Sequence, residues 1–157
     1  ILIISAGGNE GRNIDQENTP GFYPASYSFN NIITVGALDK NMEKVHSSNW
    51  GETSIDIFAP GKKIKSAFPN FRSAEMTGTS QATAFVTGAA SLVLTHNKRL
   101  KRSQRASYTK KVLFATGYKS GPLNRLCKSA SALNLKNLKK YLNYRKEKNN
   151  LIKVSNR

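Results

Sequence analysis

Short runs of apolar residues occupy the first half of the chain, and each run ends at Gly, Pro or a polar residue. They cover residues 1–5, 31–38, 54–61 and 63–68. The first two are nearly continuous, which is typical of parallel strands covered on both faces, and 54–61 alternates apolar and polar positions. We predict a strand in each run.

One longer apolar segment, residues 80–95, predicts a helix. Small and apolar side chains leave it almost without a polar face, so we expect neighbouring structure to enclose it. Two amphipathic helices are expected later. One covers 106–116, with Tyr108, Val112 and Ala115 on one face, and the other covers 134–145, with Leu135, Leu138 and Leu142 on one face and Asn134 as N-cap.

Strands precede helices, and the gaps between strands are long enough for crossovers, so the predicted class is α/β with a parallel sheet. The length of 157 residues fits one domain. No apolar run approaches the ~18 residues of a membrane-spanning helix, so no transmembrane segment is expected.

Charge divides the chain into two parts. Residues 1–90 hold seven Lys/Arg and eight Asp/Glu, whereas 91–157 hold eighteen Lys/Arg and one acid, Glu147. A balanced globular part is therefore followed by a basic part. The basic residues are scattered and match no nucleic-acid-binding motif. They can form a solvated surface or bind a polyanion or a membrane, and no specific nucleic acid is expected as a partner.

The turn before the long helix, Thr77-Gly78-Thr79-Ser80, raises a question of chemistry. Its simplest interpretation is a hydroxyl cap of the helix. However, a Ser in the first turn of a buried helix also lies at the positive end of the helix dipole, where a nucleophile and an oxyanion site can share one scaffold.

A serine nucleophile needs a base, and the chain has two histidines. His96 follows the helix, about 24 Å along its axis from Ser80, and cannot reach it. His46 lies in a loop and could approach Ser80, although an exposed loop histidine is the commoner situation. The single cysteine, Cys127, cannot form an internal disulfide.

Four sequence motifs resemble, in the same order, those of the subtilisin-like serine proteases. GTSQATAFVTGAA resembles the active-serine motif of that family, with Ala84 in place of its proline. SAGGNEG resembles the segment with its oxyanion asparagine. YPASY with NIITVGAL, and SSNWG with IDIFAPG, resemble its Tyr-Pro-Ala and Ala-Pro-Gly regions.

This resemblance implies a role for individual residues. Ser80 matches the nucleophile and Asn9 the side-chain donor of the oxyanion hole. Ala6, Gly7 and Gly8 match the strand end that helps to wall the substrate pocket. The match of Pro24 implies a cis Tyr23–Pro24 bond.

The family's Asp and His motifs do not occur in these 157 residues. We therefore expect residues 1–142 to be the C-terminal part of a subtilisin-like catalytic domain, and 143–157 a basic, frayed tail. The implied activity is that of a serine endopeptidase acting through an acyl-enzyme on Ser80. It requires the missing N-terminal half as a partner, so the fragment alone is expected to be inactive. The alternative is an incomplete pseudoprotease remnant whose basic part binds a polyanion or a membrane surface.

Further expectations rest on the resemblance alone. It implies a protein or peptide substrate and a secreted or cell-surface location. Calcium is a possible ligand by resemblance, but no metal-ligand cluster or other cofactor motif is evident in the sequence.

Overall fold

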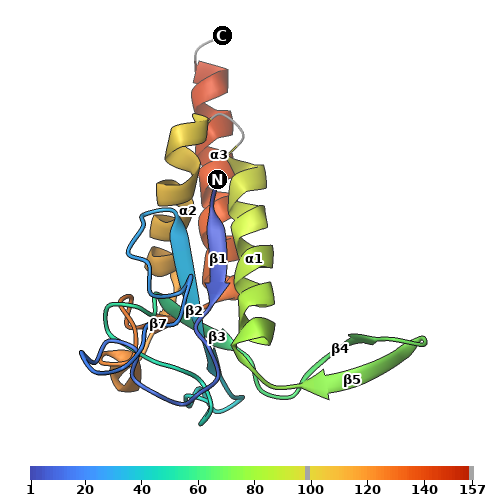
Figure 1. The fold of residues 1–157 in the computed structure, drawn as a ribbon. Coiled ribbons are helices and arrows are strands. Elements are labelled where there is room, and N and C mark those ends of the chain that lie inside the picture. Colours follow the sequence, from blue (N-terminus) through green and yellow to red (C-terminus); the bar gives the residue numbers. More distant parts are fainter. Residues whose placement is uncertain (98–99, 156–157) are drawn as a thin grey trace.

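A computed structural model of the chain describes residues 1–97 and 100–155 (Figure 1). Its main sheet contains, in spatial order, β1 (Ile3–Ala6), β2 (Ile32–Leu38), β3 (Ile57–Pro60), β7 (Ser131–Ala132) and β6 (Tyr118–Lys119). The first four strands are parallel and β6 is antiparallel to β7. The predicted α/β class with a parallel sheet is confirmed.

Three helices, α1 (Thr79–His96), α2 (Arg102–Thr116) and α3 (Leu135–Ser155), stand side by side (Figure 1). α1 packs on β1, β2 and β3, and α2 and α3 pack against α1. The core between helices and sheet includes Val35, Ile57, Val86, Leu113 and Leu138. A smaller cluster around Phe58, Leu123 and Cys127 lies with the loops and the 3-10 turn Gly121–Leu123.

The expectation that the long helix is enclosed is wrong for this chain. Ala82, Val86 and Val93 are buried, but Phe85 and Leu92 on the same helix are 37 % and 49 % exposed. The sequence of α1 therefore contains more apolar residues than its contacts with the described residues bury. Its exposed side is available to structure outside the described residues.

The face of α2 that is buried differs from the predicted one by about one position. Val112 is buried as predicted, but Thr109, Leu113 and Thr116 complete the buried face, and Ala115 is exposed. Thr109 and Thr116 can be buried because their hydroxyls donate to the carbonyls of Arg105 and Val112 one turn earlier. A pattern of apolar residues cannot reveal a buried polar residue whose hydroxyl is hydrogen-bonded within its own helix.

The start of α3 agrees with the prediction, because the Asn134 side chain accepts a hydrogen bond of 3.0 Å from the Asn137 N–H. Leu138 and Leu142 are buried, whereas Leu135 is exposed. The helix continues through residue 142 to Ser155, beyond the predicted end at 145. The predicted division at 142 therefore falls inside a helix.

A hairpin of β4 (Ile64–Phe68) and β5 (Arg72–Met76) forms a separate two-stranded sheet. It projects sideways from the foot of α1 (Figure 1). β5 was not predicted, because most of its residues are exposed and burial has left no apolar pattern in them. The Tyr23–Pro24 bond is cis, as expected. None of the helices in the described residues is long and apolar enough to cross a membrane.

Candidate active site

Ser80 lies in the first turn of α1, close to where the parallel strands end. The Gly78 N–H donates to the Gly61 carbonyl (2.8 Å), and the Gly61 N–H donates to the Leu38 carbonyl at the end of β2 (2.8 Å). A Cβ on Gly61 would lie 2.5 Å from the Ala37 Cβ and 2.8 Å from the Gly78 oxygen. Glycine is thus needed for the close approach that fixes the start of the helix.

The Ser80 side chain is exposed, and its hydroxyl has no hydrogen-bond partner among the residues that the structure describes. Its backbone N–H belongs to the first turn of α1, where N–H groups have no acceptor within the helix. The positive end of the helix dipole lies at the same point. A hydroxyl and a free N–H are therefore presented together where negative charge is stabilised.

Asn9, seventy residues earlier than Thr79, meets this turn directly. Its side-chain oxygen accepts hydrogen bonds from the Thr79 N–H (2.9 Å) and the Thr79 hydroxyl (3.2 Å). The Thr79 hydroxyl accepts in turn from the Gly8 N–H (3.2 Å). Because N–H and O–H donors hold Oδ1, the Asn9 NH₂ group must point the other way, and it donates to no other described residue.

Asn49 holds the loop that carries Asn9. Its side-chain oxygen accepts from the Glu10 and Arg12 N–H groups, and its NH₂ group donates to the Gly7 carbonyl and the Glu10 carboxylate. Asn49 is fully buried. Asn49 belongs to the SSNWG motif, and its role was not predicted. The only signal was a polar residue inside a motif, with nothing to indicate its distant partners.

Gly7 and Gly8 are buried and Ala6 is half-buried. Gly7 extends the β1 ladder, since its N–H donates to the Val35 carbonyl (2.9 Å). Gly8 has a φ of +97°, and a Cβ there would lie 2.4 Å from the Asn49 amide nitrogen. The glycine pair thus lets the chain turn sharply from β1 towards Asn9. The role of these residues in substrate binding stays a prediction.

Asp15 provides a second tie between the same two loops. Its carboxylate accepts from the Thr53 N–H (2.7 Å) and the Ser54 N–H (3.0 Å). Burial acts to raise the Asp15 pKa, but the hydrogen bonds from Thr53 and Ser54 together outweigh it and hold this pKa below its ordinary value of 3.8.

We predict that this tie is lost in acid. A carboxyl group whose pKa is depressed in the folded state stabilises that state above the unfolded pKa, and the contribution is lost as pH falls through the folded pKa. The midpoint of thermal unfolding should therefore fall more steeply below pH 4 for wild type than for Asp15→Asn. Amide exchange at Thr53 and Ser54 should accelerate over the same range. Identical acid profiles for the two proteins would contradict the assignment.

Neither histidine lies with Ser80. His96 is at the opposite end of α1, where its Nδ1 is 2.9 Å from the Leu92 carbonyl oxygen. His46 is exposed in its loop, and it is not among the residues that line the hollow next to Ser80. In the described part of the chain, no three His, Cys, Asp or Glu side chains gather as a metal-binding group.

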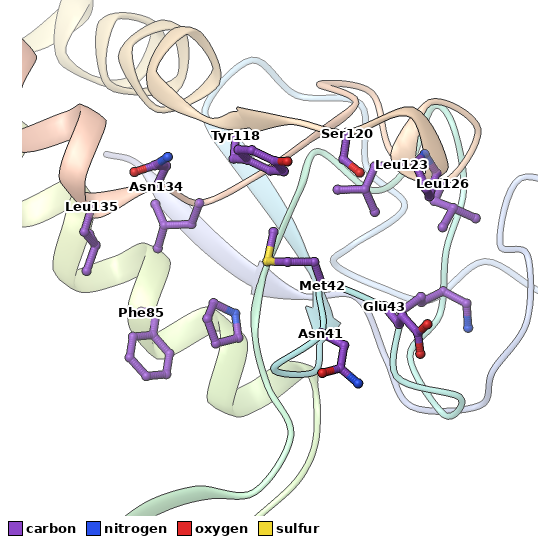
Figure 2. A pocket seen from close by; sticks show the side chains of 14 residues that line it. Asn41, Met42, Glu43, Phe85, Tyr118, Ser120, Leu123, Leu126, Asn134 and Leu135 are labelled. Atoms are coloured by element: carbon purple, nitrogen blue, oxygen red, sulfur yellow. The ribbon is translucent and has the colours of Figure 1, made fainter.

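Hollows in the described part of the chain lie against α1. One, of about 700 Å³, is lined by Ser80, Ala84, Gly88 and Leu92 on the exposed side of the helix, together with β4. The other, of about 910 Å³, is shown in Figure 2. Met42, Tyr118 and Phe85 are among its lining residues, and none of the predicted site residues lines it. The first hollow is therefore the one that belongs to the candidate site.

Comparison with known proteins gives a consistent result. The family model described as "Subtilase family" matches residues 1–144. Subtilisin BL of Lederbergia lenta is 34 % identical over 128 residues, which are 79 % of this chain and 44 % of that protein. The cell wall-associated protease of Bacillus subtilis (strain 168) is 37 % identical over 111 residues, 71 % of this chain and 11 % of that protein.

Solved structures agree with the sequence relatives. The A-subunit of the AB5 toxin from E. coli superposes with a TM-score of 0.78 at 26 % identity, covering 90 % of this chain and 50 % of the toxin chain. The prenylagaramide maturation protease PagA superposes with a TM-score of 0.68 at 31 % identity, covering 90 % and 50 %. The chain thus spans half or less of the length of each of these proteins.

Proposed function

Because the chain belongs to the subtilase family, we propose that it forms the serine-bearing part of an endopeptidase that cleaves peptide bonds through an acyl-enzyme on Ser80. The observation that carries this proposal is the contact between Asn9 and Thr79. This contact supports the proposal because it brings the Asn9 side-chain amide next to Thr79, the residue that precedes Ser80. A protein or peptide substrate follows from the reaction.

The proposed reaction begins with attack of the Ser80 hydroxyl oxygen on the substrate carbonyl carbon. The hydroxyl proton passes to a base, and the carbonyl oxygen becomes an oxyanion that accepts from the Asn9 NH₂ group and the Ser80 N–H. The base then gives the proton to the leaving amine, the C–N bond breaks, and the acyl group stays on Ser80 until water hydrolyses it.

The base has to come from residues outside this chain. His96 and His46 lie away from the Ser80 hollow, and the relatives that match this chain extend over at least twice the matched length. We propose that a preceding half of the same domain supplies a histidine and its orienting aspartate. That half would pack on the exposed side of α1, where Phe85 and Leu92 are now open. Here "the longer protein" means this chain joined to that half.

The location that this proposal favours is the cell surface or the outside of the cell. The supporting relative is the cell wall-associated protease of Bacillus subtilis. The alternative function is a remnant that lacks a working base and acts through its basic part. Eighteen of the twenty-five Lys and Arg residues lie after residue 90.

We predict that a fluorophosphonate probe labels Ser80 rapidly in the longer protein and at a negligible rate in the 157-residue chain alone. The reason is that serine without a base is a poor nucleophile. Labelling is followed by mass spectrometry of the modified peptide, with Ser80→Ala as the control. Labelling that survives Ser80→Ala would exclude this nucleophile. A longer protein that contains the histidine and aspartate motifs but does not react would favour the remnant.

A further inference from the structure

The hairpin arm, residues 62–76, stands apart from the rest of the molecule. Among the strands of the described residues, β4 and β5 pair only with each other, and most of their residues are exposed. Figure 1 shows the arm reaching away from the helices and the sheet. With five residues per strand, its tip lies about 17 Å from its base.

Two features of the tip of the arm, its backbone conformation and its exposed aromatic rings, cost free energy unless a partner binds there. Asn70 and Phe71 both have left-handed backbone conformations, with φ of +62° and +56°. Such positions suit Asn or Gly, and a bulky residue there is strained. Phe71 is also 110 % exposed, so its ring contacts almost nothing in its own chain, and Phe68 nearby is half exposed. Strain of this kind is retained mainly where it serves a function.

Positive charge is concentrated on the same arm. Four of the seven basic residues among positions 1–90 lie on it, against one acid, Glu75. Lys62 pairs with Asp39 (3.4 Å). Lys63, Lys65 and Arg72 form no ion pair with any residue in the described ranges. Three exposed cations therefore lie along the arm, with Lys63 and Lys65 before the aromatic tip and Arg72 after it.

We propose that the hairpin arm docks on an anionic membrane surface, with Phe68 and Phe71 entering the apolar edge of the lipid and Lys63, Lys65 and Arg72 contacting head groups. Aromatic side chains are favoured at the boundary between head groups and acyl chains, to a depth of about 5–10 Å, and basic side chains bind anionic lipids. A convex tip suits a deformable surface, whereas a binding site for a peptide side chain is normally concave.

The arm would also determine where the candidate active site stands. β5 ends at Met76, four residues before Ser80, and Met76 and most of β4 line the Ser80 hollow. A docked tip therefore holds Ser80 above the lipid surface, at a height set by the length of the arm less the depth to which the tip enters the lipid. Proteins that project from a membrane would be presented to the site at this height.

The test uses the longer protein with Ser80→Ala, to prevent self-cleavage, and vesicles of phosphatidylcholine with and without phosphatidylserine. Phe71→Ala should lower co-sedimentation with the anionic vesicles roughly tenfold, because it removes a buried aromatic side chain. Lys63→Gln with Lys65→Gln should lower it about tenfold on anionic vesicles only. Phe29→Ala, which removes another exposed phenylalanine, is the matched control and should have no effect.

A second variant separates docking from a structural role. Phe71→Gly should raise the midpoint of thermal unfolding, because glycine adopts this φ without strain, and should also lower vesicle binding. In Phe71→Trp, tryptophan emission should shift to shorter wavelength when anionic vesicles are added.

Three results would overturn the proposal. The first is wild-type vesicle binding by Phe71→Ala. The second is a lower midpoint for Phe71→Gly, which would mean that the ring packs against the longer protein. The third is vesicle binding that depends on Arg102 and Lys111 of α2 instead of on the arm. The same variant can also be tested for cleavage of a soluble protein, in the longer protein that keeps Ser80. If Phe71→Ala weakened this cleavage and left vesicle binding unchanged, the tip would bind protein substrates instead of lipid.

Discussion

Replacing Asn9 with Leu in the longer protein should lower kcat by about 10²–10³ and leave KM almost unchanged. The size of this effect is that known for a subtilisin, a member of the same family. The direction follows from the site. The Asn9 NH₂ group is left without a partner among the described residues, because Oδ1 is held by Thr79. In the proposed reaction an oxyanion forms only as Ser80 attacks, so this donor is expected to act in the transition state more than on bound substrate.

Asn9→Asp is the matched variant that separates catalysis from structure. An aspartate can still accept from the Thr79 N–H, so it keeps the tie to α1, but it cannot donate to an oxyanion. We therefore expect Asn9→Asp to retain the thermal stability of wild type and to lose at least as much kcat as Asn9→Leu. If Asn9→Asp kept normal kcat, Asn9 would only position the helix. If Asn9→Leu raised KM alone, Asn9 would be a substrate-positioning residue.

Replacing Lys110 with Met should lower the free energy of unfolding by about 3 kcal/mol. The Lys110 ammonium donates to the Asp56 carboxylate (2.8 Å) and to the Ile32 carbonyl (2.7 Å), and the two side chains are only 17 % and 7 % exposed. The pair ties α2 to β2 and to the segment that enters β3. Without Lys110, the Asp56 carboxylate keeps one described donor, the Thr34 N–H. A buried charge with so few partners is costly.

Lys111→Met is the control, because Lys111 is the next residue on the same helix and is exposed. Denaturant unfolding of the longer protein, carrying Ser80→Ala, measures both variants. Asp56→Asn combined with Lys110→Met should recover part of the loss, since neither partner then leaves a buried charge. Equal effects of Lys110→Met and Lys111→Met would show that the pair contributes no more than a surface lysine.

Much of the layered fold could be predicted from local pattern. The runs at 1–5 and 31–38 appear as β1 and β2, and the apolar segment 80–95 appears as α1, within two residues at each end. β2 is buried at every position and α1 is buried along one face, whereas in β1, at the edge of the sheet, only Ser5 is buried. Burial selects apolar residues, and this selection made the elements recognisable. β5 and the two-residue strands β6 and β7 were not predicted, because exposed or very short strands carry no such selection.

The sequence alone determined which chemistry is possible. The order of four motifs indicated the family, and the position of Ser80 at a helix start is a local property of the GTS turn and the apolar run after it. Only the tertiary structure decided how the site is assembled. The bonds from Asn9 to Thr79, and from Asn49 to Gly7, Glu10 and Arg12, join segments 37 to 70 residues apart. The neighbouring sequence of a polar residue does not show whether its side chain binds a distant loop or faces water. Its role therefore appears only when folding brings its partners within hydrogen-bonding distance.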